Sequence, residues 1–326
     1  MTDKVSNILV TGGAGFIGSS LVLSLIKKGH RVTVVDNLST GRKENLNPVL
    51  SLDKFKFIQL DLLELDKLIE VVKEYEVVFH LAANVQVKLG QANTNIDFLN
   101  NIVATRNVLE CMRNSDKCKK IIFSSSSVIY GEPLIIPTPE DYGPLKPISL
   151  YGASKLACEA LISGYASVFG LSGVIFRLAN IIGPSSNHGV IPDFINKLSA
   201  SDGKFLDILG DGTQNKSYLY IDDLIEALHI GLSRLEHTLE IFNVASDDQT
   251  DVNSIARIII EELGLENTQI KYLFTEMDGR GWAGDVKNMS LSTENLKKRG
   301  WQIRHSSRES VRTTVRKIIE LRDKKI

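Results

Sequence analysis

The sequence predicts an α/β fold in which a doubly wound parallel sheet is followed by a smaller C-terminal α/β region. Short runs of continuous apolar residues recur through the first half of the chain, and segments with helical periodicity separate them. A glycine-rich turn joins the first apolar run to the first helical segment. The loops between these elements are short, which is typical of sheets built from strand–helix–strand units.

The first strand is expected at 7–10, and the glycine turn at 11–18 leads into a helix from about Ser19 to Lys28. The second strand, at 31–35, ends abruptly at an acidic residue. Five or six strands separated by helices indicate a doubly wound sheet. The elements expected next are strands at 55–60, 77–81, 120–123 and 173–177 and helices at 65–73, 95–113 and 151–169.

The character of the sequence changes after about Leu178, where loops lengthen and turn residues cluster at 183–189 and 210–213. We therefore expect a first domain at 1–178 and a second, smaller domain at 179–326. The chain is expected to cross back to the first domain around 218–245.

The totals limit the class of protein. A chain of 326 residues with 43% apolar residues can build a large core, and its net charge of -1 gives no bulk attraction to nucleic acid or to an anionic membrane. No apolar run is long enough to span a bilayer, and the polar start predicts no signal peptide. The three cysteines fit neither a disulfide framework nor metal-ligand spacing, so we expect a reducing, cytoplasmic setting and no metal: Cys111, Cys118 and Cys158.

The glycine turn has the pattern of a dinucleotide site. Gly12, Gly15 and Gly18 are spaced G-x-x-G-x-x-G between a strand and a helix, so backbone can approach a pyrophosphate at the helix N-terminus. Asp36, at the end of the second strand, can accept bonds from ribose hydroxyls and would repel a 2′-phosphate. We therefore predict NAD, while the basic residues at 42–43 keep NADP open.

Two later strand ends can also meet a cofactor. Asp61 and Leu62 end the third strand and suit an adenine contact, although an ordinary acid at a strand end is the plain alternative. Small residues after the fourth strand would let backbone lie close to a cofactor. We interpret His80 as a packed histidine rather than a catalyst. The residues that follow it are Leu81, Ala82 and Ala83.

A phenol and an ammonium lie four residues apart at Tyr151 and Lys155, on one face of the predicted helix. Tyrosine ordinarily has a pKa of about 10, and an ammonium about 4 Å away could lower it enough for acid/base work near neutral pH. A pair on an exposed helix face is the plain alternative. The serines at 124–127 follow a buried strand, where an open α/β sheet binds its ligands.

Together these segments resemble the extended short-chain dehydrogenase/reductase superfamily, over essentially the whole chain. Within its NAD-dependent epimerase/dehydratase family, the sequence is most similar to sugar-nucleotide epimerases of the UDP-glucose 4-epimerase type, in particular archaeal-type members. The segments that carry the resemblance are TGGAGFIG at 11–18, DNLSTG at 36–41, HLAA at 80–83, SSSSVIYG at 124–131, PISLYGASK at 147–155, RLANIIGP at 177–184, GDGTQNKSYLYIDD at 210–223 and GDV at 284–286.

The resemblance implies a Rossmann-like NAD-binding first domain and a nucleotide-sugar-binding second domain. It makes Tyr151 the acid/base, Lys155 the residue that holds the nicotinamide ribose and lowers the pKa of Tyr151, and Ser126 the catalytic serine. The implied cofactor contacts are Gly12, Gly15, Phe16, Ile17, Gly18, Asp36, Asn37, Asp61, Leu62, Leu81, Ala82, Ala83, Asn101, Tyr151 and Lys155. The implied substrate contacts are Asn180, Gly189, Val190, Lys216, Tyr218, Arg280 and Asp285.

The implied reaction is a transient oxidation of a UDP-sugar. Tyr151 takes the proton of the C4 hydroxyl while the C4 hydride goes to NAD⁺, and the 4-keto sugar turns over and takes the hydride back on its other face. The resemblance also implies a homodimer, in which the helices near 95–113 and 151–169 pair with their mates.

Departures from the family pattern narrow the chemistry. Related 4,6-dehydratases place an Asp-Glu pair after the catalytic residue, and related decarboxylases place a Glu second, but this chain has Ser127 and Val128. Neither residue can serve as a general acid or base at neutral pH. A nucleotide-sugar 4-ketoreductase and, from a different class, a non-catalytic NAD-binding regulator remain the alternatives.

Two expected phosphate contacts also depart from the family. Lys216 stands where many relatives carry Arg, which keeps the charge but loses the bidentate fork. Trp282 stands where many carry an Arg three residues before the aspartate, here Asp285, and Arg280 lies two residues further back. Either Arg280 reaches the pyrophosphate through a longer turn, or the pyrophosphate is held more loosely.

Overall fold

The computed structural model describes residues 5–85, 90, 92–233, 235–274, 279–282 and 284–323. Its main sheet has seven strands in the order β11-β6-β5-β4-β1-β2-β3, and the pairs β1–β2, β1–β4, β2–β3 and β4–β5 are parallel. The predicted doubly wound, Rossmann-like sheet is therefore confirmed. The strands are β1 (Asn7–Thr11), β2 (Arg31–Asp36), β3 (Phe55–Gln59), β4 (Val77–His80), β5 (Lys120–Ser126), β6 (Ser172–Leu178) and β11 (Leu239–Val244).

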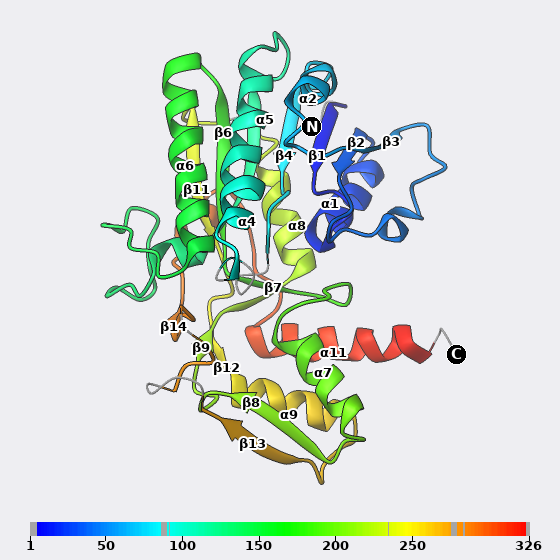
Figure 1. Cartoon of the computed structure of the whole chain (residues 1–326), viewed down its shortest axis with the longest axis vertical. Helices are drawn as coiled ribbons and strands as arrows, with labels where there is room; N and C mark the ends of the chain where they lie inside the picture. The colour runs from blue at the N-terminus through cyan, green and yellow to red at the C-terminus, as the bar shows by residue number, and fades with distance from the viewer. Residues whose placement is uncertain are drawn as a thin grey trace. The chain divides into compact units, whose positions relative to one another are not determined.

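Helices cover the sheet as its buried strands require. Residues of α2, α5 and α6 share one apolar core with β1, β4, β5 and β6, and Figure 1 shows α5 and α6 side by side. Each helix adds buried aliphatic side chains, such as Leu68, Val108 and Ile162. The helices near this sheet are α1 (Phe16–Lys27), α2 (Leu65–Val72), α5 (Ala104–Arg113), α6 (Leu150–Phe169) and α8 (Ile221–Ile230), with the 3-10 helices η1 (Lys43–Leu46) and η3 (Ser127–Tyr130).

The single helix predicted at 95–113 is interrupted. A short α4 (Asn95–Asp97) is followed by a π-helical segment, η2 (Phe98–Val103), before α5 begins. A π-helical turn shifts the phase of the side chains that follow it, and periodicity alone does not reveal one. The segment lies directly before α5 and beside α6, so it affects residues close to the predicted catalytic helix.

Two further differences concern strands. Strand β5 extends through Ser126, so three of the four serines belong to the strand rather than to the loop after it. The seventh strand, β11, was not located from the sequence. It comes late in the chain and joins the sheet beside β6, a long-range pairing that local patterns do not predict.

The chain forms two compact units. The first unit contains 1–129, 149–177 and 225–242, and the second contains 130–148, 178–224 and 243–326. The second unit has its own apolar core, built from α7, β8, α9 and α11. Its elements are β7 (Asn180–Ile182), α7 (Val190–Ala200), β8 (Phe205–Leu209), β9 (Asn215–Lys216), β10 (Tyr218–Tyr220), β12 (Thr250–Asp251), α9 (Val252–Glu262), β13 (Gln269–Leu273), β14 (Asn288–Met289), α10 (Glu294–Lys298) and α11 (Ser307–Asp323).

Small sheets organise the second unit. Strand β7 pairs with β10, and β8 pairs with β13, both in parallel, while β9 lies between β12 and β14. Within the described ranges, no helix combines the length and the apolar character needed to cross a membrane. The same residues contain no group of three or more His, Cys, Asp or Glu side chains arranged for a metal ion.

Candidate active site

Two of the three glycines in the turn pack closely against other backbone atoms. Gly12 has a positive φ of 71°, and a Cβ there would lie 2.6 Å from the backbone nitrogen of Ala82. A Cβ on Gly18 would lie 2.1 Å from the Gly12 carbonyl oxygen. At the partly exposed Gly15 a Cβ would lie 3.3 Å from the Gly12 carbonyl oxygen, so this position is less crowded than the other two. The turn is therefore tightest at Gly12 and Gly18, where a side chain would collide with backbone.

The N-terminus of α1 fits the pyrophosphate of a dinucleotide. The first N–H groups of a helix lack intrahelical acceptors, and α1 has neither a side-chain cap at Gly15 nor an acidic residue in its first turn. Phe16 and Ile17 are partly exposed at this end. A helix end of this kind binds phosphate through its free N–H groups and its dipole, so the residues present suit the predicted cofactor.

Asp36 is buried and braces the glycine turn. One carboxylate oxygen accepts the Ala14 N–H at 3.0 Å, and the other accepts the Leu38 N–H at 2.8 Å. The exposed Asn37 donates its side-chain amide to Asp61 at 2.9 Å, which ties the ends of β2 and β3 together. These acids therefore lie at the carboxyl edge of the sheet, where the sequence places the adenosine ribose and the adenine.

The end of β4 supports the same edge. His80 is buried and both ring nitrogens are bonded, to the hydroxyl of Thr11 at 2.7 Å and to that of Thr105 at 2.9 Å. Burial, aided by the charge of Lys155, lowers the pKa of His80 to about 3, so the ring is neutral. This bonding matches the packed histidine that we predicted. Four predicted cofactor contacts follow the ends of β3 and β4, of which the first is buried and the others are partly exposed: Leu62, Leu81, Ala82 and Ala83.

Helix α6 presents Tyr151 and Lys155 one turn apart. The helix begins after Ser149, whose hydroxyl accepts the Gly152 N–H at 3.1 Å. It ends at Gly170, which takes the left-handed conformation with φ of 68°. Both ends are thus fixed by local bonding that the sequence supplies.

The three predicted catalytic residues come together in the first unit. Ser126 ends β5, and its side chain is hydrogen-bonded to Tyr151. Lys155 is buried, donates to the Ser124 carbonyl at 2.8 Å and lies 4.7 Å above the Phe123 ring. Its Nζ is 6.0 Å from the centre of the Tyr151 ring. Ser126 and Tyr151 remain partly exposed, so a ligand can reach them.

The pKa of Tyr151 differs from the expectation. Burial raises the pKa of Tyr151 above its ordinary value, and only the bond from Ser126 acts to lower it. Without a cofactor, the direction is therefore opposite to the one we expected from Lys155. The reason is that the Lys155 ammonium is held at the Ser124 carbonyl, while the phenol loses hydration. Burial also lowers the pKa of Lys155, to about 8.

A buried ion pair behind the catalytic helix was not predicted. Arg177 donates to Glu159 from Nε and from a terminal nitrogen, the latter at 2.8 Å, and Ser125 donates to the same carboxylate. The two charged side chains are only 5% and 6% exposed. Glu159 stands four residues after Lys155, so a search along the helix face could have singled it out.

Asn101 lies at the centre of a second unpredicted network. Its side-chain oxygen Oδ1 accepts the Asn84 backbone N–H at 2.8 Å, and its side-chain NH₂ donates to Ser154 at 2.8 Å and to Asp97 at 3.3 Å. The side chain is 1% exposed. The structure thus places this predicted cofactor contact as a buried connection between the π-helical segment and α6.

The predicted phosphate contacts gather around Asp285 in the second unit. Lys216 donates to the Asp285 carboxylate at 2.5 Å, and its Nζ lies 5.7 Å from the centre of a Trp282 ring. Arg280 donates to the Asp285 carbonyl oxygen at 2.7 Å and pairs with Glu132 at 2.7 Å. Arg280 therefore reaches the same cluster as Lys216.

The other predicted substrate residues occupy different settings. Tyr218 is buried in the second core, and burial raises the pKa of its phenol. Asn180 begins β7 and donates its side-chain amide to the Ser217 carbonyl at 3.0 Å. Gly189, with φ of 95°, precedes the first helical residue of α7, Val190. These positions lie at element ends, and Tyr218, the first residue of β10, is also a core residue.

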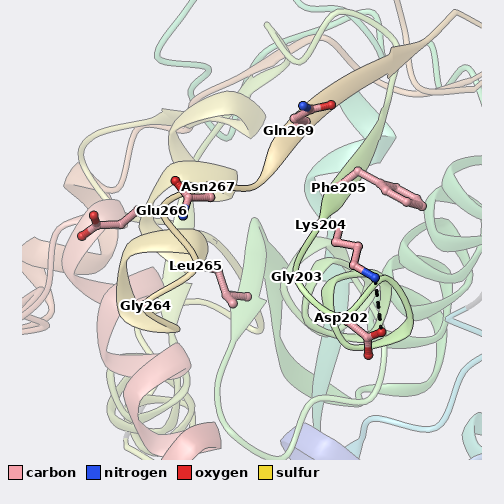
Figure 2. A pocket seen from close by; sticks show the side chains of 9 residues that line it. All are labelled: Asp202, Gly203, Lys204, Phe205, Gly264, Leu265, Glu266, Asn267 and Gln269. Carbon is pink, nitrogen blue, oxygen red and sulfur yellow. Dashed lines mark ion pairs between the residues drawn. The ribbon is translucent and has the colours of Figure 1, made fainter.

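A separate hollow on the second unit has no part in this site. The hollow has a volume of about 470 Å³, and Figure 2 draws the residues that line it. Lys204 and Asp202 form an ion pair there, at 3.9 Å. Both side chains are largely exposed. The residues that line it include none of the predicted substrate contacts: Asp202, Gly203, Lys204, Phe205, Gly264, Leu265, Glu266, Asn267 and Gln269.

Comparison with known proteins gives close relatives over the full length. A Methanocaldococcus jannaschii protein, whose name assigns it provisionally to UDP-glucose 4-epimerase, is 35% identical over 314 residues, which cover 94% of this chain and 97% of that protein. A crystal structure of a UDP-galactose 4-epimerase is 39% identical, with a TM-score of 0.85 and coverage of 97% and 99%. The Thermus thermophilus UDP-glucose 4-epimerase in complex with NAD is 30% identical, with a TM-score of 0.84 and coverage of 96% and 99%.

Other relatives carry different activities in their names. They include a UDP-N-acetyl-alpha-D-glucosaminuronate decarboxylase of Bacillus cytotoxicus and a dTDP-glucose 4,6-dehydratase of Streptomyces venezuelae. The model of the NAD dependent epimerase/dehydratase family matches residues 8–245. The chain belongs to the NAD-dependent epimerase/dehydratase family, whose cofactor is NAD.

Proposed function

We propose that this enzyme interconverts the C4 epimers of a UDP-sugar of the UDP-glucose/UDP-galactose type. The observation that carries the proposal is the combination of Ser126, Tyr151 and Lys155 with no acid in the two following positions, Ser127 and Val128. Dehydration or decarboxylation would need a further acid or base there. Epimerisation needs only one proton-transfer group and a hydride acceptor.

The chain's own residues have separate tasks in this reaction. Ser126 orients the C4 oxygen of the sugar beside Tyr151, and Tyr151 takes the hydroxyl proton and later returns it. Lys155 holds the cofactor ribose and places its charge close to the phenolate. NAD, when bound, would supply the hydride acceptor for C4. The residues thus orient the substrate and move one proton in each direction.

The raised pKa of Tyr151 suggests how cofactor and base are coupled. Burial keeps the phenol protonated in the chain alone. The positive nicotinamide ring of NAD⁺ and the Lys155 ammonium both favour the phenolate. With a pKa of about 8, Lys155 is mostly charged at pH 7. We infer that NAD binding converts Tyr151 into a base.

Each unit would bind one of the two ligands. The first unit, which corresponds largely to the predicted domain 1–178, would hold NAD at the α1 N-terminus, Asp36 and the end of β4. The second unit, which contains most of 179–326, would hold the nucleotide-sugar. Lys216 and Arg280 supply the cations for its pyrophosphate, since both are partly exposed beside Asp285.

The test mixes purified protein with UDP-glucose or UDP-galactose, without added NAD, and follows the sugar by NMR. We expect both substrates to reach the same mixture of epimers. If no common UDP-hexose, UDP-hexosamine or UDP-hexuronate interconverts, the proposal fails. Consumption of NADH or NADPH with a 4-keto sugar would identify the 4-ketoreductase instead. NAD binding without turnover of any of these sugars would identify the non-catalytic regulator.

We also propose a homodimer through the helices at 95–113 and 151–169. Exposed apolar side chains on these helices support it, with Phe98 52%, Leu99 40%, Val168 71% and Phe169 45% exposed. Light scattering after gel filtration tests the state directly. A monomer at micromolar concentration would rule out this assembly.

A further inference from the structure

Asp97 is a buried carboxylate to which the proposed reaction gives no role so far. It ends α4 and is 2% exposed. One oxygen, Oδ1, accepts the side-chain amides of Asn84 at 2.8 Å and of Asn101 at 3.3 Å. The other, Oδ2, is buried and accepts no hydrogen bond from the residues that the structure describes. A buried carboxylate with one unbonded oxygen is costly, unless a nearby positive charge compensates it.

Hydrogen bonds connect Asp97 to the start of the catalytic helix. The Asn101 amide that meets Asp97 also donates to the Ser154 hydroxyl at 2.8 Å, and this hydroxyl donates to the Tyr151 carbonyl at 2.8 Å. The π-helical segment that begins at Phe98 lies between Asp97 and α5. The carboxylate is therefore connected through two side chains to the backbone that carries the predicted base.

The charged groups that face Lys155 come from several elements. From α6 come Tyr151, whose ring centre lies 6.0 Å from Nζ, the thiol of Cys158 and the carboxylate of Glu159; from α4 comes Asp97; from β4 comes His80, whose ring is neutral. Arg177 from β6 neutralises Glu159 with two hydrogen bonds. Burial raises the pKa of Cys158, which keeps its thiol neutral. Among the described residues, Asp97 is thus the carboxylate near Lys155 that forms no ion pair with an arginine or with another lysine.

We propose that Asp97 is a positioning residue whose carboxylate is the buried counter-charge of the Lys155 ammonium, and that it fixes the Tyr151 turn through Asn101 and Ser154. The inference rests on the proposed acid/base role of Tyr151, but not on which sugar is converted.

The Asp97 charge shifts the pKa values of Lys155 and Tyr151 in a definite direction. Burial lowers the pKa of Lys155, while the carboxylates of Glu159 and Asp97 act against this. Burial raises the pKa of Tyr151, and Asp97 raises it further. Removal of the Asp97 charge must therefore lower both pKa values. The Tyr151 limb and the Lys155 limb of the pH profile would move to lower pH together, which a loss of packing alone does not cause.

The experiment compares the wild type with Asp97→Asn, which removes the charge and keeps the shape. We expect both limbs of the kcat/KM profile to shift down by roughly 0.5–1 pH unit. A second readout needs no sugar: the phenolate absorbance of the NAD-saturated protein, after subtraction of the matching Tyr151→Phe variant, should show the same downward shift. This readout separates failure of the inference from failure of the proposed epimerase.

Two matched variants complete the design. Ser154→Ala interrupts the hydrogen-bond connection but keeps the charge, so it should lower kcat without moving either limb. Glu110→Gln removes a carboxylate on α5 that pairs with Arg113 and should change neither property. If Asp97→Asn does not fold, Asp97→Ser is measured in its place. A folded variant with reduced kcat and unmoved limbs, or an unmoved phenolate titration, would overturn the inference.

Discussion

The ion pairs near the candidate site differ in exposure between the two units. In the first unit, Arg177 and Glu159 pair behind the catalytic helix, almost fully shielded from solvent. In the second unit, Lys216 pairs with Asp285 and Arg280 with Glu132, and the two cations are 15% and 19% exposed. The first pair has no room to exchange partners. The cations of the second unit can still reach a ligand.

The difference shows how charge can serve one reaction in two ways. A buried ion pair holds the two elements that carry it together, because either charged side chain would be strongly destabilising if it were buried without its partner. Ser125 joins this pair from β5, so the strand that ends at Ser126 is tied to the helix of Lys155. A partly exposed cation instead retains its hydration and can replace a protein carboxylate by a phosphate. Substitutions in both units test this difference between buried and partly exposed charges.

The largest effect is expected at the proton-transfer group itself. Tyr151→Phe removes the hydroxyl but keeps the ring, so kcat should fall about 10²–10⁴-fold, as for loss of a general acid/base. Turnover of UDP-glucose measures the change, and the NAD content of the purified variant serves as the control. Unchanged turnover in a folded variant that retains NAD would remove Tyr151 from the mechanism.

The next effect concerns stability rather than chemistry. Glu159→Gln removes the carboxylate with which the buried Arg177 guanidinium pairs, which should cost about 3–5 kcal/mol in the free energy of unfolding. Glu262→Gln is the matched control, because Glu262 pairs with two partly exposed arginines of α11 and its loss should cost far less. Urea denaturation measures both variants. Equal losses would show that burial does not distinguish the two regions.

These two variants also mark the limit of prediction from sequence. The glycine turn, Asp36, Tyr151 and Lys155 could be predicted because each sits in a local pattern whose spacing has a physical reason. The same holds for the strands of the sheet up to β6. Pairing of Glu159 with Arg177 joins residues 18 positions apart on different elements, so only the packed structure reveals it.

Asn101 and Tyr151 show a second limit. The sequence predicts their presence near the cofactor, but not that the Asn101 amide is already shared between two protein partners. It predicts a lysine near the phenol, but not that burial outweighs this charge in the chain alone. Both outcomes depend on how many atoms surround a group, and spacing along a chain does not contain that information.

A smaller effect is expected at the lysine of the second unit. Lys216→Gln removes a charge-assisted contact of roughly 1.5–3 kcal/mol, so KM for the UDP-sugar should rise about 10–100-fold while kcat changes little. Lys216→Arg keeps the charge and should stay close to the wild type. A large fall in kcat with unchanged KM would instead indicate that Lys216 positions the reacting groups.

The smallest effect separates Arg280 from Trp282. Arg280→Gln should weaken binding of UDP by about 3–10-fold, because it removes one partly exposed cation that Glu132 already holds. Trp282→Phe keeps an aromatic face and should change binding by less. Isothermal titration at two salt concentrations distinguishes the causes, since the loss at Arg280 should shrink at high salt, where the wild-type attraction is screened. A larger loss for Trp282→Phe would mean that ring contact, rather than the second cation, holds the nucleotide. In that case the contrast with the first unit would rest on Lys216 alone.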